Sequence, residues 1–319
     1  MVGKLTRDDQ LSASRIPVLL NASPYQTRNE VLAEMIDIDR GGKANRIPQN
    51  EAMYWGDTLE EQILTVAAER LGLKDLRTSF PAAFQHPTLP LAASLDGAAT
   101  GSRKWAADPA NGIYTPQGGD MIDLTGEILL EAKNTSVQPE NPPAPHRGPL
   151  QLQAQLMCTG LKAGVIAVLY RGTELRLFLY RADPNIQQRI RLAIEDFEER
   201  RKTGEMYPIT SPEDGVAAYP TGIADRLYWD DGEGDEATAI DCLMHALKQK
   251  ADAEEDIAEF TSAIMEKMGR AEEVEAMVGN RRVLVKWPSR TYRAQPEKLT
   301  PAKPERTVRS KTLQIKELD

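Results

Sequence analysis

The stretch GEILLEAKNTS, residues 126–136, places a carboxylate and a lysine at the end of an apolar run. Alternation with a period of two across residues 128–133 predicts a strand, in which Glu131 and Lys133 point to the same face. Burying both charges is costly unless they are paired, solvated or bound to a metal ion. Two hypotheses follow: a functional pair, or a strand that runs out into solvent with an ordinary ion pair.

Two further acids occur at regular places around this strand. Glu60 lies on a predicted helix after the dipeptide WG, and Asp96 follows a short predicted strand in SLDG. Acids at the ends of adjacent strands can converge at one edge of a sheet, and hard oxygen ligands favour Mg²⁺ or Mn²⁺. The pattern therefore predicts a carboxylate metal site. Taken singly, Glu60 would be a solvated helix charge and Asp96 a turn residue.

Three glutamines alternate at the start of the helix that we predict after the strand, at positions 151, 153 and 155. Alternate positions on a helix cannot all face one site. Gln151 is therefore the candidate functional residue, and we expect Gln153 and Gln155 to face solvent or backbone.

The elements that must position these residues follow from periodicity and turn signals. Gly72 is expected to cap the second helix, and Thr58 with Glu61 to form a first-turn cap. The segment 97–123 is predicted as a surface loop and 134–149 as a mobile loop over the site. Helices are predicted at 28–38, 54–73, 150–161, 185–204 and 237–268, and strands at 89–95, 128–133, on both sides of a turn at 171–173, at 281–287 and at 312–315. This order predicts an α/β fold.

Composition excludes several classes of protein. The 319 residues include only two cysteines and three histidines, so a disulfide framework and a zinc cluster are not expected. No apolar run approaches the ~20 residues of a spanning helix, and charges interrupt the first twenty residues. The chain has no GxxxxGK[ST] or GxGxxG motif for phosphate binding. We expect a protein of the reducing cytoplasm, without a membrane partner.

Charge is distributed unevenly. The net charge is −9, and residues 213–280 hold 18 acidic against 5 basic side chains, whereas residues 281–311 hold 10 basic against 2 acidic. A net negative charge ordinarily argues against a nucleic-acid partner. A basic groove in an acidic protein can still attract DNA, because field lines focus in clefts.

Five motifs in order, SASRIPVLLNASPY, WGDTLEE, SLDG, LLEAK and QLQAQLMCTG, resemble the lambda-type phage exonucleases of the YqaJ-like branch. The resemblance covers most of residues 1–210. It implies a restriction-endonuclease-like core with a central mixed β-sheet flanked by helices. Residues 211–319 would form a helical and basic C-terminal extension packed on that core. Longer members carry a helical extension that ends in a short strand, which RRVLVKW resembles.

The resemblance also implies roles for individual residues. Asp96, Glu131 and the backbone carbonyl of Ala132 would be metal ligands, and Glu60 would support a second ion. Lys133 would position or deprotonate the attacking water, with help from Gln151.

A 5′-phosphate site is implied by a second spacing. Lambda-like members have an arginine seven residues before a serine at this site, and Arg7 and Ser14 keep that spacing. The alternative is that Ser14 caps a helix beginning near Arg15.

The function implied is that of a Mg²⁺-dependent exonuclease of phage or prophage recombination, with two ions per site. It would resect duplex DNA ends 5′ to 3′ and leave 3′ single strands for an annealing protein, working as a ring-shaped trimer. A structure- or site-specific endonuclease on the same metal core is one alternative. A catalytically inactive DNA-binding assembly protein is another.

Overall fold

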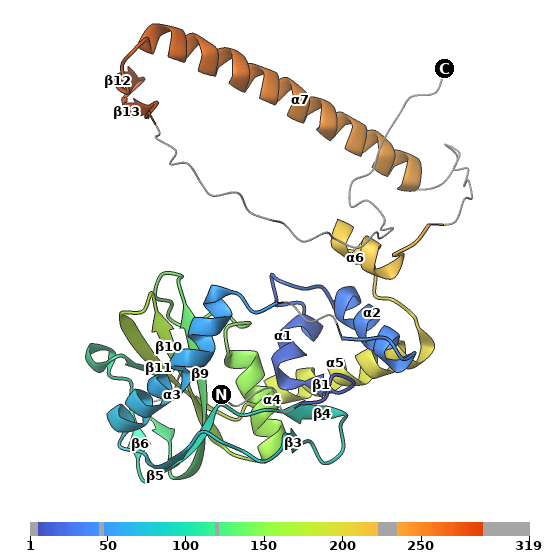
Figure 1. Cartoon of the computed structure of the whole chain (residues 1–319), viewed down its shortest axis with the longest axis vertical. Helices are drawn as coiled ribbons and strands as arrows, with labels where there is room; N and C mark the ends of the chain where they lie inside the picture. Colours follow the sequence, from blue (N-terminus) through green and yellow to red (C-terminus); the bar gives the residue numbers. More distant parts are fainter. Residues whose placement is uncertain (1–5, 45–47, 119–120, 223–234, 290–319) are drawn as a thin grey trace, which may run out of the picture. The chain divides into compact units, whose positions relative to one another are not determined.

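The computed structural model describes residues 6–44, 48–118, 121–222 and 235–289 (Figure 1). The chain divides into two compact units, residues 1–220 and 221–319. This boundary lies beyond the predicted one after residue 210, because helix α6 (Pro212–Ala218) packs on helix α2 (Arg28–Asp39) of the first unit. The predicted packing of the extension on the core stays a prediction.

A six-stranded mixed sheet forms the centre of the first unit. The central pair, β9 and β10, is parallel, and β5 and β11 flank it in antiparallel orientation. The strand order is β2 (Lys74–Arg77), β5 (Gly97–Gly101), β9 (Gly126–Thr135), β10 (Ala163–Tyr170), β11 (Glu174–Arg181) and β7 (Ile113–Tyr114). The predicted α/β fold with a central mixed sheet flanked by helices is confirmed.

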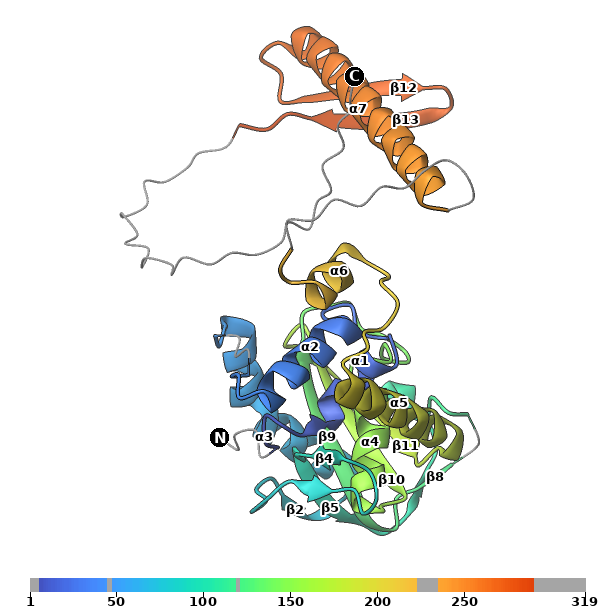
Figure 2. The same cartoon turned by 90° about the vertical axis from the view of Figure 1, so that its right-hand side faces the viewer.

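Helices cover both faces of this sheet (Figure 2). Ile128 and Leu130 of β9 pack in one buried cluster with helix α3 (Glu51–Leu71), whereas Leu129 packs in another with helix α4 (Pro149–Thr159). Successive strand residues point to opposite faces, so the two clusters lie on opposite sides of the sheet. Helices α1 (Ile16–Leu19), α2 and α5 (Pro184–Thr203) contribute to the α4 side.

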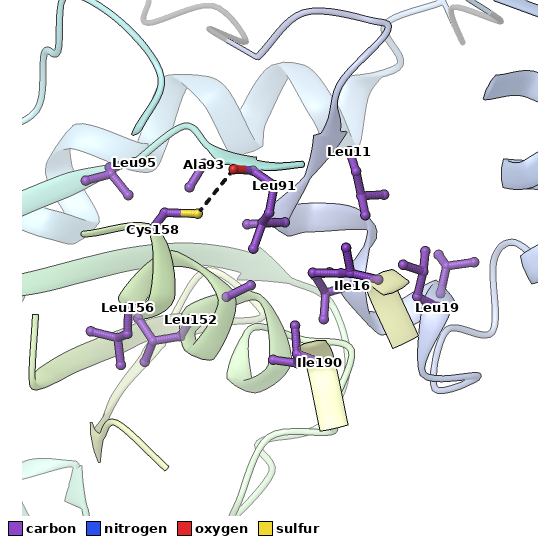
Figure 3. Close-up of a cluster of buried hydrophobic side chains, with 14 of the residues drawn as sticks. Leu11, Ile16, Leu19, Leu91, Ala93, Leu95, Leu152, Leu156, Cys158 and Ile190 are labelled. Atoms are coloured by element: carbon purple, nitrogen blue, oxygen red, sulfur yellow. Dashed lines mark hydrogen bonds between the residues drawn. The ribbon is translucent and has the colours of Figure 1, made fainter. Parts of the chain in front are cut away.

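The cluster on the α4 side joins segments far apart in the sequence (Figure 3). A three-stranded sheet of β1 (Leu11–Ser12), β4 (Leu91–Ala93) and β3 (Phe84–Gln85) extends it. The thiol of Cys158 donates to the Leu91 carbonyl at 3.8 Å, and burial raises its pKa to about 12. Cys158 is therefore an inert core residue.

Helix α3 begins earlier than its apolar spacing indicates. Asn50 caps it, accepting from the Met53 N–H at 3.0 Å, and Gly72 ends it in the left-handed conformation as predicted. The first-turn cap expected of Thr58 is wrong. Because the helix already has two turns before it, the Thr58 hydroxyl donates to the Tyr54 carbonyl instead, at 2.7 Å.

The segment 97–123 is more than the surface loop that we predicted. Its first residues form β5, paired with β9 from Gly97↔Leu130 to Gly101↔Gly126, and its later ones form β7 at the sheet edge. Strand β6 (Lys104–Trp105), before β7, pairs with β8 (Ile122–Asp123), after β7, in a separate two-stranded sheet. The sequence of β5, GAATG, does not predict a strand, because its small residues show no apolar alternation. A Cβ on Gly97 would approach Leu64 of α3 to 3.1 Å, so the helix packs close to this strand.

The second unit contains helix α7 (Asp235–Met268) and a hairpin of β12 (Glu273–Val278) and β13 (Arg281–Lys286). The helix and the second strand were predicted, whereas β12, rich in Glu, was not. The strand predicted at 312–315 lies outside the described residues. Across the described ranges no helix is long and apolar enough to cross a membrane.

Candidate active site

Glu131 and Lys133 form an ion pair on one face of β9, with the ammonium donating to Glu131 Oε1. Glu131 is completely buried, and the Lys133 side chain is 28% exposed. The alternative of a strand running out into solvent is therefore wrong for this carboxylate. Lys133 Nζ also donates to Gln151 Oε1 at 3.3 Å, which ties the strand to the first turn of α4.

Gln155 holds the second oxygen of Glu131. Its Nε2 donates to Glu131 Oε2 at 2.6 Å and to the Ser94 carbonyl at 3.3 Å. Its own Oε1 is buried and has no hydrogen-bond partner among the residues that the structure describes. The expectation that Gln155 faces solvent or backbone is thus wrong. The signal was its spacing from Gln151, because residues i and i+4 share a helix face.

Gln153 points away from the site, as expected from its place between the other two. Its amide donates to the Arg181 carbonyl at 2.9 Å and accepts from the Asp183 N–H at 2.8 Å. Both partners are backbone groups, so its role is to join α4 to the start of α5.

Asp96 stands where β5 begins and reaches across to β9. Its Oδ2 accepts from the Ala132 N–H at 2.9 Å. The N–H and C=O of one strand residue point to the same neighbouring strand. The Ala132 carbonyl therefore faces the Asp96 side of β9, beyond the last β5 partner at Gly97↔Leu130.

Glu60 adds a third carboxylate from α3, on a cleft of about 500 Å³. The structure brings nearly all the predicted site residues to this cleft. Those that line it are Ser14, Glu60, Asp96, Glu131, Ala132, Lys133 and Gln151.

The carboxylates of the cleft shift one another's protonation. Burial, then Glu131 and then Glu60 raise the pKa of Asp96 well above its usual range. Burial, followed by Glu131 and Asp57, raises the pKa of Glu60. Burial alone would lower the pKa of Lys133, but the surrounding carboxylates outweigh it and raise that pKa, so the amine stays protonated. The site has an excess of negative charge that one ammonium does not balance.

Arg7 is not brought to the cleft. Its side chain is 72% exposed and pairs with Asp9, with Nε donating to Oδ1 at 2.9 Å. Ser14 does line the cleft, and its hydroxyl lies 2.9 Å from that of Ser12. The alternative role of Ser14 as a helix cap is wrong, since Ser12 and Arg15 occupy the cap positions of the two short helices there.

The donor set fits a hard divalent cation. Carboxylate oxygens and a backbone carbonyl are the ligands that Mg²⁺ and Mn²⁺ prefer, and the raised pKa of Asp96 marks a place where added positive charge is favourable. In the described part of the chain, no three His, Cys, Asp or Glu side chains already converge on one point. Glu131 instead turns both oxygens to Lys133 and Gln155.

Residues 4–162 match the model of the YqaJ-like viral recombinase domain, a span that contains every residue lining the cleft. The chain carries a YqaJ-like viral recombinase domain. No curated protein compared with the chain is significantly similar to it in sequence.

The YqaJ-like domain also has similar solved structures. The alkaline exonuclease LHK-Exo from Laribacter hongkongensis is 18% identical, with 62% of this chain and 90% of that chain covered and a TM-score of 0.45. A phage-related exonuclease from Haemophilus somnus 129PT is 10% identical, with 61% and 94% covered and a TM-score of 0.42. At TM-scores below 0.5, these likenesses support no conclusion about the chemistry of this chain.

Proposed function

We propose that the chain is a metal-dependent deoxyribonuclease, an exonuclease that degrades duplex DNA from its 5′ ends and leaves 3′ single strands. The observation that carries this proposal is the convergence of Asp96, Glu131 and Lys133 from β5 and β9 in one cleft of a viral recombinase domain. A phosphodiester is an anion that such a carboxylate site does not attract by itself. Divalent cations would reverse the local charge and admit it.

Asp96, Glu131 and the Ala132 carbonyl would hold the first cation, and Glu60 would support a second. We expect Mg²⁺, with Mn²⁺ as a substitute. When bound, such ions polarise the phosphoryl group and make a water molecule more acidic.

The chain's own residues would then orient the reactants. Lys133, held by Glu131 and Gln151, would position or deprotonate the attacking water. Gln155 would fix the Glu131 carboxylate in one orientation. Ser14 remains a candidate for the 5′-phosphate at the edge of the cleft, and Arg7 would have to leave Asp9 to join it.

The proposal also covers the biological process, the location, the partner protein and the assembly of the enzyme. The enzyme would act in phage-type recombination, in the cytoplasm of a bacterial host, as a phage- or prophage-encoded protein. Its product strand would pass to a single-strand annealing protein, and a ring trimer would confine the DNA. Residues 1–210 would be the nuclease core, with the later residues as an extension.

Linear and closed circular duplexes test this function against its rivals. With Mg²⁺, the proposal predicts that linear DNA loses nucleotides from its 5′-ended strands, that closed circles stay intact and that chelator stops the reaction. Cutting of circles would favour the structure- or site-specific endonuclease. Binding without hydrolysis of either DNA would favour the inactive assembly protein.

A further inference from the structure

A second groove lies at the opposite end of α4 from Gln151. It has a volume of about 390 Å³, and its lining includes Met157 and Gly160 at the end of α4 and Gln187 and Gln188 in the first half of α5. The remaining polar lining is His86, Lys162 and Arg191. We call this set the His86 groove.

The His86 groove carries positive charge without any acid to balance it. Among the described residues that line it, none is an aspartate or a glutamate. Within the described ranges neither Lys162 nor Arg191 forms an ion pair, whereas Arg176, Arg200 and Arg201 of the same unit all do. The Gln187 amide donates to Gln153 Oε1 at 3.5 Å and has a second N–H to offer, as does Gln188. A concave surface with unpaired cations and such amides is chemically suited to an anion.

The ring of His86 is fixed so that it adds a hydrogen-bond donor. Its Nδ1 accepts from the N–H groups of Thr88 at 3.1 Å and Leu89 at 3.0 Å. Burial, and then the charge of Arg191, lowers the pKa of the ring, so it is neutral at pH 7. A neutral imidazole with Nδ1 as acceptor carries its proton on Nε2. The groove therefore combines a neutral donor with two cations and two amides.

The distance from the cleft suits a nucleic acid. Helix α4 has 11 residues, and at ~1.5 Å per residue its two ends are about 16 Å apart. Each strand of duplex DNA carries one phosphate per ~3.4 Å of helix axis, so this length corresponds to about five nucleotides. A DNA strand held in the cleft thus has phosphates at the right range for the far end of the helix, whereas the charge of the whole chain, −9, gives DNA no general attraction.

We propose that the His86 groove binds a backbone phosphate of the DNA substrate, as a site separate from the catalytic cleft. This inference rests on the proposed function for its choice of DNA as the phosphate source. Lys162 and Arg191 supply the charge, and His86 Nε2 and the two amides supply directional hydrogen bonds.

The test measures DNA binding in chelator, so that it does not depend on hydrolysis. Fluorescence anisotropy with a labelled single-stranded and a labelled duplex oligonucleotide would be followed from 50 to 200 mM salt for the full chain. The variant is K162A/R191A. The matched control is K74A/R189A, which removes one exposed lysine from β2 and one exposed arginine from α5, neither of them in the groove.

We expect K162A/R191A to bind DNA about tenfold more weakly at the low salt concentration, with the slope of log affinity against log salt reduced by about one to two. The control should stay within about twofold of the wild type. Equal losses in both variants would overturn the groove and leave only general electrostatics. Because Lys162 is exposed, K162E alone should fold and weaken binding in the same direction.

Two further measurements distinguish a DNA phosphate from a free phosphate ion, and the groove proposal from the proposed nuclease function. One possible outcome is that inorganic phosphate raises the Tm of the wild type but not of K162A/R191A, while both proteins bind DNA equally well. This result would assign the groove to a free phosphate ion and overturn our inference. If the chain hydrolyses no DNA but the groove variant still loses DNA affinity, the groove is supported and only the proposed nuclease function fails.

Discussion

The side-chain amide of Gln155 donates a 2.6 Å hydrogen bond to the carboxylate of Glu131, 24 positions earlier in the chain. Lys133 occupies the other oxygen of the same carboxylate. Glu131 is therefore oriented from both sides in a fully buried position, one side being helix α4 and the other its own strand. This pair links the packing of α4 on the sheet to the chemistry of the cleft.

Replacing Gln155 with leucine should weaken metal-dependent hydrolysis while keeping the volume of the side chain. Outer partners of metal ligands typically change metal affinity or activity by about 10- to 100-fold. We expect a loss of that size in nuclease activity and a higher Mg²⁺ concentration for half-maximal rate, measured by nucleotide release across a Mg²⁺ titration. An unchanged Mg²⁺ dependence would show that Gln155 has no part in orienting Glu131.

Gln153→Leu is the matched control on the same helix. Gln153 bonds to the backbone groups of Arg181 and Asp183, and its Oε1 also accepts from the Gln187 side chain at 3.5 Å. Leaving these groups unpaired should lower the free energy of unfolding by about 1–3 kcal/mol. The Mg²⁺ requirement of the folded protein should not move.

Asp96→Asn should make the metal-free protein more stable while abolishing activity. Burial, Glu131 and Glu60 raise the pKa of Asp96 in the folded state, so its ionisation destabilises the fold as pH rises from the ordinary carboxyl range through that raised value. Asparagine does not ionise, and its oxygen can still accept from the Ala132 N–H. In chelator at pH 8, we expect Tm to rise by about 2–4 °C, which is about 1 kcal/mol for a unit of this size.

Measuring the stability of Asp96→Asn and the wild type at several pH values tests the direction of this effect. The stability difference between Asp96→Asn and the wild type should shrink below pH ~4, where the unfolded carboxyl is also protonated. Adding Mg²⁺ should stabilise the wild type more than the variant, because only the wild type keeps the charged carboxylate ligand. A variant that is less stable than the wild type in chelator at pH 8 would contradict the electrostatic account.

Asn29→Ala tests the buried hydrogen bonds that join α2 to the chain after α5, away from the cleft. The buried Asn29 amide donates to the Tyr207 carbonyl at 3.0 Å and accepts from the Tyr207 N–H at 2.7 Å, which ties α2 to the chain after α5. Its loss leaves two backbone groups unpaired, so we expect the free energy of unfolding to fall by about 2–4 kcal/mol in denaturant titrations. Because Asn29 is not in the cleft, the Mg²⁺ requirement of the folded fraction should be unchanged. An unfolding free energy equal to that of the wild type would contradict this role.

Several parts of the fold could be predicted because local signals agreed with the final packing. The structure confirms the strand predicted from the alternation in β9 and the helix predicted from the apolar spacing of α3. Both elements bury the face that their apolar residues indicate. Strand β5 could not be predicted in the same way. Its buried position depends on small residues that let α3 approach, and a run such as GAATG carries no periodic signal for this.

The candidate site likewise contains residues that the sequence predicts and residues that it does not. Strand geometry predicts that Glu131 and Lys133 share a face, and the series of motifs marks them, with Glu60 and Asp96, as candidate site residues. The alternation of the three glutamines favours Gln151 alone, but Gln155 is four residues later and shares its helix face. The prediction for Arg7 rests on the spacing of an arginine and a serine in the lambda-type family. In the structure the Arg7 side chain instead forms an ion pair with its near neighbour Asp9, which that spacing does not reveal.

The most direct test of the account compares the wild type with Glu131→Gln and Lys133→Met on a linear duplex, with nucleotide release and DNA binding measured in parallel. The account predicts that the wild type releases nucleotides with Mg²⁺ and not with chelator. Both variants should lose release by at least about 10³-fold, a loss of about 4 kcal/mol in transition-state stabilisation, with DNA affinity within a few-fold of the wild type. Nucleotide release by Glu131→Gln at the wild-type rate would contradict the proposal that this cleft is the catalytic site.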